Sequence, residues 1–581
     1  MKRNLFLILG VVLVVVAGVV GWIIQTDDGR VAIRDVRFMG ANGKVMSALL
    51  YIPKTATAKT PAPGILAVHG YINSRETQSG FAIEFARRGY VVLALDQTGH
   101  GYSDPPAFAN GFGGPDGLKF LRSLDFVDKD NIGMEGHSMG GWTLLAAAAV
   151  MPDAYKSAVL EGSSTGAPFA AEGSPTWPKN LAVVYSKYDE FSVLMWGVPR
   201  ALDVTHSDKL KKVFGTTSDI EPGKVYGSIA DGTARVLYTP TTTHPGDHIS
   251  NVAIGYSIDW FGQTLKGGSV LPSTDQIWIW KELATLVGFI GFVFFLLGMG
   301  RVLLGTKTFA PIAGTPPTTT PFTGAAWWLW AAVTAAIPVV FFYLFMNLGA
   351  GVKASWLFPQ TITSQIMVWA LMNGAIFLVL FIVWHFTSAA KRGANAATYG
   401  LVKPDKSGGG LVGLDLLYAI AVVFAGYVLL SLAAFFFKID FRFWVVALKP
   451  MSRLQFGIFL RYLIPFAAFF FISSMTLHAQ YRLPNASRGA RYFANMGIMA
   501  AGFLVFLLLE YITLFARGML LTASEPLNTI VAIQFLPLMI VASIFSTWFY
   551  ENTGRVWAGS FVNALLITWY IAAGQATQFP L

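Results

Sequence analysis

The sequence has no cysteine and few charged residues. Without a Cys among its 581 residues, the chain cannot form disulfides, thiolate metal sites or a cysteine nucleophile. Charged residues make up only 13% of the sequence, whereas hydrophobic residues make up 54%. A composition this apolar is unusual for a water-soluble protein of this length and typical of one that is partly embedded in lipid.

Sequence patterns of metal, nucleotide and nucleic-acid sites are also missing. No His, Asp or Glu cluster has a ligand spacing such as His-Glu-x-x-His, and the Gly-rich segment 111–114 lacks the Lys-Ser/Thr of a phosphate loop. The formal net charge is +10, but many Lys and Arg residues stand at the ends of apolar stretches and form no basic stripe with interleaved aromatic residues. We therefore expect no metal, no cofactor and no nucleic-acid partner, and a lipid bilayer as the partner.

Long apolar stretches divide the chain into three parts. An apolar run of about 20 residues, Leu5 to Ile24, follows two basic residues and is long enough to span a bilayer. No small-x-small cleavage site follows it, which favours an uncleaved anchor over a signal peptide. Eight further stretches of spanning length lie between residues 283 and 577. The predicted parts are a transmembrane anchor (1–24), a soluble domain (25–275) and a membrane domain of about eight transmembrane helices (276–581).

Basic residues at the ends of the stretches predict an orientation. If Lys2 and Arg3 are cytoplasmic, the basic loops 391–406 and 482–491 lie on the same side, as the positive-inside rule requires. The basic loop 438–455 would then lie outside, so it is either an interfacial helix or a sign that the span count is off by one. We expect an integral protein of the cell membrane with residues 25–275 on the extracytoplasmic side; the sequence leaves the oligomeric state open.

A Gly-x-Ser-x-Gly turn occupies residues 136–140 of the soluble domain. In residues 64–265 short apolar runs alternate with helical patterns, which predicts a mostly parallel sheet with helices on both faces. The turn follows a predicted strand and opens an Ala-rich helix, and its glycines let the backbone fold tightly while the Ser138 hydroxyl projects. Ser138 is therefore the candidate nucleophile, with a helix-capping serine as the alternative interpretation.

Residues 30–266 resemble the α/β-hydrolase superfamily of serine hydrolases. Besides the turn, the resemblance is carried by the segments 68–71, 96–103 and 127–133, and it is strongest toward dienelactone hydrolases, prolyl-oligopeptidase-type catalytic domains and polyester hydrolases. It implies an α/β hydrolase fold and an oxyanion hole formed by the backbone N–H groups of Tyr71 and Met139. In this interpretation His69, His100 and His137 are supporting residues.

The superfamily order of the catalytic residues is Ser, acid, His. Asp189 follows the predicted strand 181–185 and is the candidate acid, with Glu190 as a weaker substitute. The loop before the final helix offers two bases. The resemblance to polyester hydrolases implies His244, whose offset to that helix matches the position of their base, and His248 is the alternative. Ser138 would attack an acyl carbon, pass its proton to the His and form an acyl-enzyme that water hydrolyses.

The predicted function is that of a membrane-anchored serine hydrolase, esterase- or lipase-like, that cleaves an ester, lipid or other acyl bond; peptidase activity is an open alternative. Two other functions are compatible with the sequence: a membrane acyltransferase with the same triad, and a transporter or channel with a hydrolase-like extracytoplasmic domain. Apolar residues in the segment 191–230 either line an acyl pocket or pack in the core. They are Phe191, Leu194, Met195 and Trp196.

Overall fold

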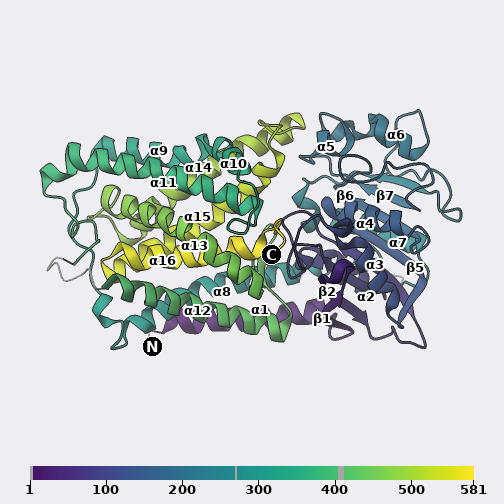
Figure 1. Ribbon diagram of the computed structural model, residues 1–581, viewed down its shortest axis with the longest axis horizontal. Helices are drawn as coiled ribbons and strands as arrows, with labels where there is room; N and C mark the ends of the chain where they lie inside the picture. The colour runs from purple at the N-terminus through teal and green to yellow at the C-terminus, as the bar shows by residue number, and fades with distance from the viewer. Residues whose placement is uncertain (1–3, 269–270, 404–410) are drawn as a thin grey trace.

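The computed structural model describes residues 4–268, 271–403 and 411–581. Lys2, Arg3 and Lys406, which contribute to the predicted orientation, lie outside these ranges. Figure 1 shows two halves side by side, with the strands and their helices in one and the long helices in the other. The first helix, α1 (Leu5–Gln25), belongs to the helical half although it precedes the strands in sequence.

An eight-stranded mixed sheet forms the core of the first half. Its strand order is β1-β2-β4-β3-β5-β6-β7-β8; β2 runs antiparallel to both of its neighbours, β1 and β4, and the remaining pairs are parallel. The predicted mostly parallel sheet is thereby confirmed, but the β1–β2 hairpin at its edge was missing from the prediction. The strands are β1 (Val31–Met39), β2 (Val45–Pro53), β3 (Ala62–Val68), β4 (Val91–Asp96), β5 (Val127–His137), β6 (Ser157–Glu161), β7 (Leu181–Val184) and β8 (Arg235–Tyr238).

Helices cover both faces of the sheet, as predicted. Successive strand residues alternate between the faces, so Leu66 packs in one apolar cluster with α3 (Gly114–Ser123) and α4 (Met139–Val150). Its neighbour Ile65 packs in the other with α2 (Ser79–Arg87) and α7 (Asn251–Thr264). The region between β7 and β8 adds the short helices α5 (Ser192–Trp196) and α6 (Asp208–Phe214).

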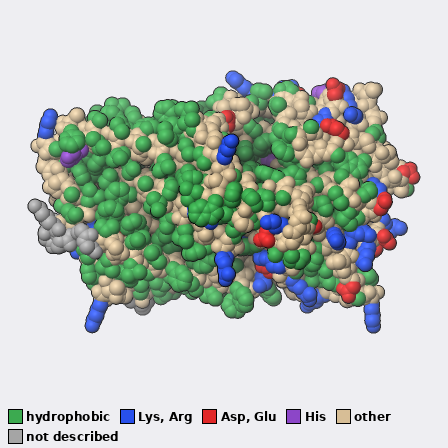
Figure 2. Space-filling view, in the orientation of Figure 1, with side chains coloured by type: hydrophobic (Ala, Val, Ile, Leu, Met, Phe, Trp, Pro, Cys, Tyr) green, Lys and Arg blue, Asp and Glu red, His purple; other side chains and the backbone are tan. Residues whose placement is uncertain are grey.

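The second half consists of long apolar helices. Within the described residues nine helices, α1 included, are long and apolar enough to cross a membrane, which agrees with the predicted count and suggests an integral membrane protein. Figure 2 shows hydrophobic side chains over most of this half, whereas acidic and basic side chains gather on the half with the sheet. Besides α1, they are α8 (Trp278–Leu304), α9 (Gly324–Val340) together with α10 (Phe342–Ala350) as one candidate span, α11 (Thr361–Trp384), α12 (Val412–Phe437), α13 (Arg453–Met475), α14 (Arg488–Arg517), α15 (Pro526–Thr553) and α16 (Val556–Gly574).

The loop 438–455 is not an interfacial helix, and that expectation was wrong. It contains a hairpin of two short strands, β9 (Phe441–Phe443) and β10 (Val446–Leu448), at the border with the sheet domain. Two of its basic side chains are paired with buried acids: Arg442 forms an ion pair of 2.6 Å with Asp440, and Lys449 one of 3.2 Å with Glu76. A positive charge that is neutralised by a buried partner carries little information about the side of the membrane on which the loop lies.

Helices α1 and α8 pack so closely that glycines are required between them. A Cβ atom at Gly10 would lie 2.5 Å from the backbone nitrogen of Phe295, and one at Gly298 would overlap the backbone nitrogen of Leu7. Small residues at helix contacts let backbones approach in this way, and packing of this kind holds helices together in lipid. The N-terminal helix is therefore an integral part of the bundle.

The contact predicts the effect of one added methyl group. We expect Gly298→Ala to destabilise the protein by about 1–3 kcal/mol, because the clash is with backbone atoms that no rotamer change can relieve. The measurement is the thermal unfolding of the detergent-purified protein. Gly457→Ala in α13 is the matched control, since a Cβ there meets nothing within 4 Å; an equal loss in both variants would contradict the prediction.

Candidate active site

Ser138 lies in a strained turn between β5 and α4. Its backbone angles are φ 55° and ψ −122°, in a region that residues with a side chain rarely occupy. A Cβ at Gly136 would overlap the backbone of Gly140, and one at Gly140 would overlap the carbonyl oxygen of Val68. The two glycines of the motif are thus required by close packing as well as by the turn. The Ser138 side chain makes no capping hydrogen bond to α4, which is contrary to the capping interpretation.

The structure brings Asp189 and His244 together, although 55 positions separate them in sequence. Asp189 lies in the loop after β7 and His244 directly before a short 3-10 helix, Pro245–Ile249; both side chains are buried. The Nδ1 atom of His244 is 2.7 Å from Oδ2 of Asp189. Burial lowers the pKa of His244, but the charge of Asp189 and this hydrogen bond outweigh it and raise the pKa above its usual value. The imidazole is therefore oriented and made more basic.

Glu190 contacts the backbone of His244 and makes no contact with its ring. One carboxylate oxygen accepts the backbone N–H of His244 at 2.8 Å, and the other accepts the hydroxyl of Tyr511 at 3.0 Å. Burial and the neighbouring Asp189 raise the pKa of Glu190 to about 7. Tyr511 belongs to α14, so a residue of the helical half holds the loop that carries His244. No pattern in the sequence pointed to Tyr511.

His248, the alternative base, lies beside the other histidines in a different environment. Its ring is 4.1 Å from that of His137, and neither of its nitrogens has a hydrogen-bond partner among the described residues. Burial lowers its pKa to about 3. His137 donates from Nε2 to the carbonyl oxygen of His244 at 2.9 Å and so supports the same loop.

The loop with Tyr71 lies directly beside Ser138. A Cβ at Gly70 would be 3.1 Å from Cβ of Ser138, which places the loop within reach of the serine. Met139 is the first residue of α4, where backbone N–H groups have no partner within the helix. The side chain of Tyr71 is fixed from the C-terminus, because Nε2 of Gln578 donates to its hydroxyl at 2.9 Å. Both predicted oxyanion donors thus flank the nucleophile candidate.

A cavity of about 280 Å³ joins these residues, and its wall comes from both halves of the molecule. Ser138, His244, His248, Tyr71 and Met139 all line it. Of the apolar residues singled out in the segment 191–230, Phe191, Leu194 and Met195 line the cavity and Trp196 is buried in the core. The helical half contributes residues that the sequence did not indicate: Trp444, Val445, Leu527, Ile530 and Gln534.

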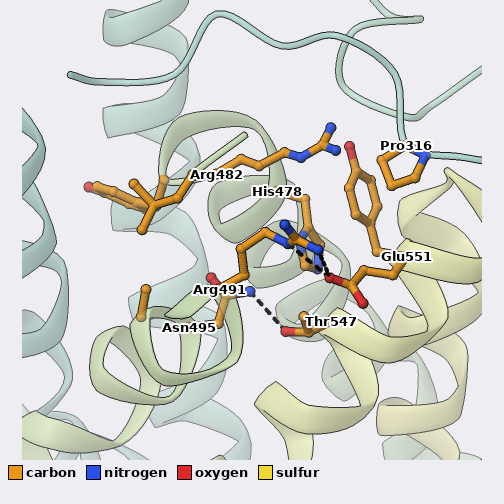
Figure 3. Close-up of a pocket in the computed structure, with 11 residues that line it drawn as sticks. Pro316, His478, Arg482, Arg491, Asn495, Thr547 and Glu551 are labelled. Atoms are coloured by element: carbon orange, nitrogen blue, oxygen red, sulfur yellow. Dashed lines mark hydrogen bonds and ion pairs between the residues drawn. The ribbon is translucent and has the colours of Figure 1, made fainter. Parts of the chain in front are cut away.

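A second, more polar cavity of about 210 Å³ lies far from this one (Figure 3). Arg491 and Glu551 form an ion pair of 2.8 Å there, and Asn495 donates to Thr547 at 2.8 Å. Arg491 stands 20 positions before Tyr511 on α14, or ~30 Å along the helix at 1.5 Å per residue. The polar cavity is therefore at the opposite ends of the helices, and none of the predicted catalytic residues lines it. In the described part of the chain, no cluster of three or more His, Asp or Glu could hold a metal ion.

Comparison with known proteins identifies a family for part of the sheet domain. Residues 63–190 match the sequence profile of the family described as alpha/beta hydrolase fold. A 2-hydroxy-6-oxononadienedioate/2-hydroxy-6-oxononatrienedioate hydrolase of Cupriavidus pinatubonensis is 35% identical over 105 residues, which cover 18% of this chain and 36% of that protein. The chain thus matches about a third of the length of this curated relative.

Solved structures that resemble the chain cover the same domain. An esterase of Pyrococcus furiosus has a TM-score of 0.31 and 16% identity, and the match covers 42% of this chain and 94% of that one. A dienelactone hydrolase-like promiscuous phosphotriesterase from metagenomic libraries has a TM-score of 0.29 and 14% identity, over 41% of this chain and 100% of that one. The chain therefore carries an alpha/beta hydrolase fold domain, matched over residues 63–190, followed by a region of many long apolar helices.

Proposed function

We propose that the protein is an integral membrane serine hydrolase that cleaves an ester or other acyl bond with Ser138, His244 and Asp189. One observation carries the proposal: the imidazole of His244 is held by Asp189 at 2.7 Å in the wall of the same cavity that Ser138 lines. An oriented base beside a serine on a strained strand-to-helix turn is the arrangement that activates a hydroxyl nucleophile. The matched family and the hydrolase activity named for the relative support the same reaction class.

The reaction follows from the positions of these groups. The Oγ atom of Ser138 attacks the acyl carbon while His244 takes its proton, and Asp189 stabilises the imidazolium that forms. The N–H groups of Tyr71 and Met139 donate to the oxyanion. The leaving group departs with the proton from His244, which leaves the acyl group on Ser138. Water then attacks this acyl-enzyme and gives a proton to His244, which passes it to the Oγ atom of Ser138 as the acid is released. Transfer to an acceptor other than water would use the same acyl-enzyme.

The nucleophile can be tested with a fluorophosphonate probe on the detergent-purified protein. We expect the wild type to be labelled and Ser138→Ala to be unlabelled, with ester hydrolysis reduced on the order of 10⁴-fold or more, because no other group can form the acyl-enzyme. Ser218→Ala, at an exposed position of the same domain, serves as the control and should react like the wild type. Equal labelling of the Ser138→Ala variant would refute the proposal.

The base can be tested through substitution and pH dependence. We expect His244→Ala to abolish hydrolysis and His248→Ala to retain most of it. His244 must be neutral to accept a proton, and its pKa is raised, so kcat/KM should fall as the pH drops through a value above the usual pKa of a histidine. Asp189→Asn should move this acid limb to lower pH and reduce kcat, because it removes the charge that raises the pKa.

Glu190→Gln is the necessary control for the pH profile. Four titratable groups besides Asp189 interact electrostatically with His244: Glu190, Asp247, His137 and His248. Of these, Glu190 has a pKa of about 7. An acid limb that disappears in Glu190→Gln but persists unchanged in Asp189→Asn would assign the titration to Glu190 and remove the support for His244. Loss of activity in His248→Ala with activity retained in His244→Ala would also remove the support for His244.

We also propose that the hydrolase domain lies outside the cytoplasm. Basic residues gather at the helix ends remote from this domain, for example Arg301 at the end of α8 and Arg488 and Arg491 at the start of α14. Basic residues in short loops at helix ends are typical of the cytoplasmic side.

The absence of native cysteine makes the orientation directly measurable. A membrane-impermeant maleimide applied to intact cells should label Lys129→Cys, which is exposed on the hydrolase domain. It should label Lys307→Cys, exposed just after α8, only after the cells are permeabilised. The reverse pattern would place the active site on the cytoplasmic side.

A further inference from the structure

One face of α15 leads from the catalytic cavity into the helical bundle. Leu527 and Ile530, near the start of the helix, line the catalytic cavity. Val531 lines a second cavity, of about 30 Å³, that lies among α11, α13, α15 and α16. Gln534 lines both, so the two cavities lie next to each other with this side chain in the wall that they share. A third cavity of about 30 Å³ shares Met539 with the second, and its other lining residues belong mainly to α9, α11, α13 and α14.

Gln534 is the last polar residue of α15 between Leu527 and Met539. The hydroxyl of Tyr570, on α16, donates to Oε1 of Gln534 at 2.5 Å. Beyond it the helix presents Phe535, Leu538 and Met539, all buried. A polar or charged group placed among these side chains would lose its hydration without gaining a partner, at a cost of several kcal/mol. A thin hydrocarbon chain can enter such narrow, apolar cavities without that cost.

The length of the route matches that of a lipid chain. Leu527 and Met539 are 12 positions apart, which is ~18 Å along a helix. One leaflet of a bilayer contributes about 15 Å, half of the hydrocarbon thickness of ~30 Å. Helix α15 is itself one of the candidate spans, and in Figure 1 it runs from the border with the sheet domain toward the far end of the bundle. The route is thus aligned with the depth of the membrane.

We propose that the substrate is a membrane lipid ester whose acyl chain lies along this face of α15, with its carbonyl carbon at Ser138. The face, defined as Ile530, Val531, Gln534, Phe535, Leu538 and Met539, is called the acyl path. This inference rests on the proposed serine hydrolase activity and adds the substrate class to it. A long, unbranched acyl chain fills the acyl path, whereas a short water-soluble ester fills only the catalytic cavity. The helical half then selects the substrate in addition to anchoring the domain.

The acyl path can be narrowed by one substitution with a close control. Val531→Phe fills the second cavity, whereas Ile533→Phe introduces the same side chain on α15 at a half-buried position that lines neither cavity. We expect Val531→Phe to lower the ratio of kcat/KM for long-chain over short-chain p-nitrophenyl esters about tenfold or more, a change of ~1.4 kcal/mol or more. Ile533→Phe should leave this ratio at the wild-type value. Fluorophosphonate labelling of Val531→Phe would show that this variant is folded. An unchanged ratio in the labelled variant would overturn the proposal.

A chemical probe locates the chain directly and does not depend on any substitution in the bundle. A long-chain alkyl fluorophosphonate with a diazirine at the chain end is attached to Ser138 of the full-length protein and then photolysed. We expect cross-links to Val531, Phe535 or Leu538 and to facing residues of α11 and α16. Cross-links confined to Phe169, Leu194 or detergent would overturn the acyl path while leaving the serine hydrolase intact. If the probe fails to label Ser138, the proposed function itself fails, and the two failures are therefore distinguishable.

Discussion

The hydrogen bond between Asp189 and His244 is the contact on which the geometry of the site depends. It connects the loop after β7 with the loop before the last helix of the sheet domain, and it holds the imidazole in the wall of the cavity that Ser138 lines. The bond is in turn supported from outside the domain. Glu190 accepts both the backbone N–H of His244 and the hydroxyl of Tyr511, so the position of the base is linked to a helix of the membrane region. The orientation of the candidate base thus depends on the contact between the two halves.

The border between the halves is held by buried charges and hydrogen bonds. Burial raises the pKa of Glu76, but Lys449 and Arg75 hold it well below its usual value, so the carboxylate is charged and paired. Isolated buried charges are costly, and a pair of this kind contributes more to a defined geometry than to stability. Trp444 adds a directional contact from the hairpin β9–β10, since its indole N–H donates to the carbonyl oxygen of Pro245 at 2.7 Å, directly after His244. These contacts hold the part of the cavity wall that the helical half contributes against the sheet domain.

Most local features of the site could be predicted from the sequence because each has a local physical signal. The strand-to-helix turn at Ser138 needs small neighbours, and the alternation of apolar runs marked the strands from β3 to β8. Other parts had signals that were weaker or ambiguous. The β1–β2 hairpin is an antiparallel edge of two nine-residue strands, and the hairpin β9–β10 is embedded among basic residues that resemble an interfacial segment. Asp189 was preferred to Glu190 from its position alone, and the structure shows the physical difference: Asp189 contacts the ring of His244, whereas Glu190 contacts its backbone.

The sequence by itself determined the classes of structure, a hydrolase-like sheet domain and nine long apolar helices in the described residues, because both are encoded in short-range periodicity and run length. The tertiary structure decided which residues meet. Tyr511, Trp444 and Gln534 reach the active-site region from more than 190 positions away in the chain, and no local pattern marks them. Their roles arise from the docking of the helical bundle against the sheet domain. Such contacts depend on the shapes and charges of two folded surfaces, and a linear sequence pattern does not record how those surfaces fit together.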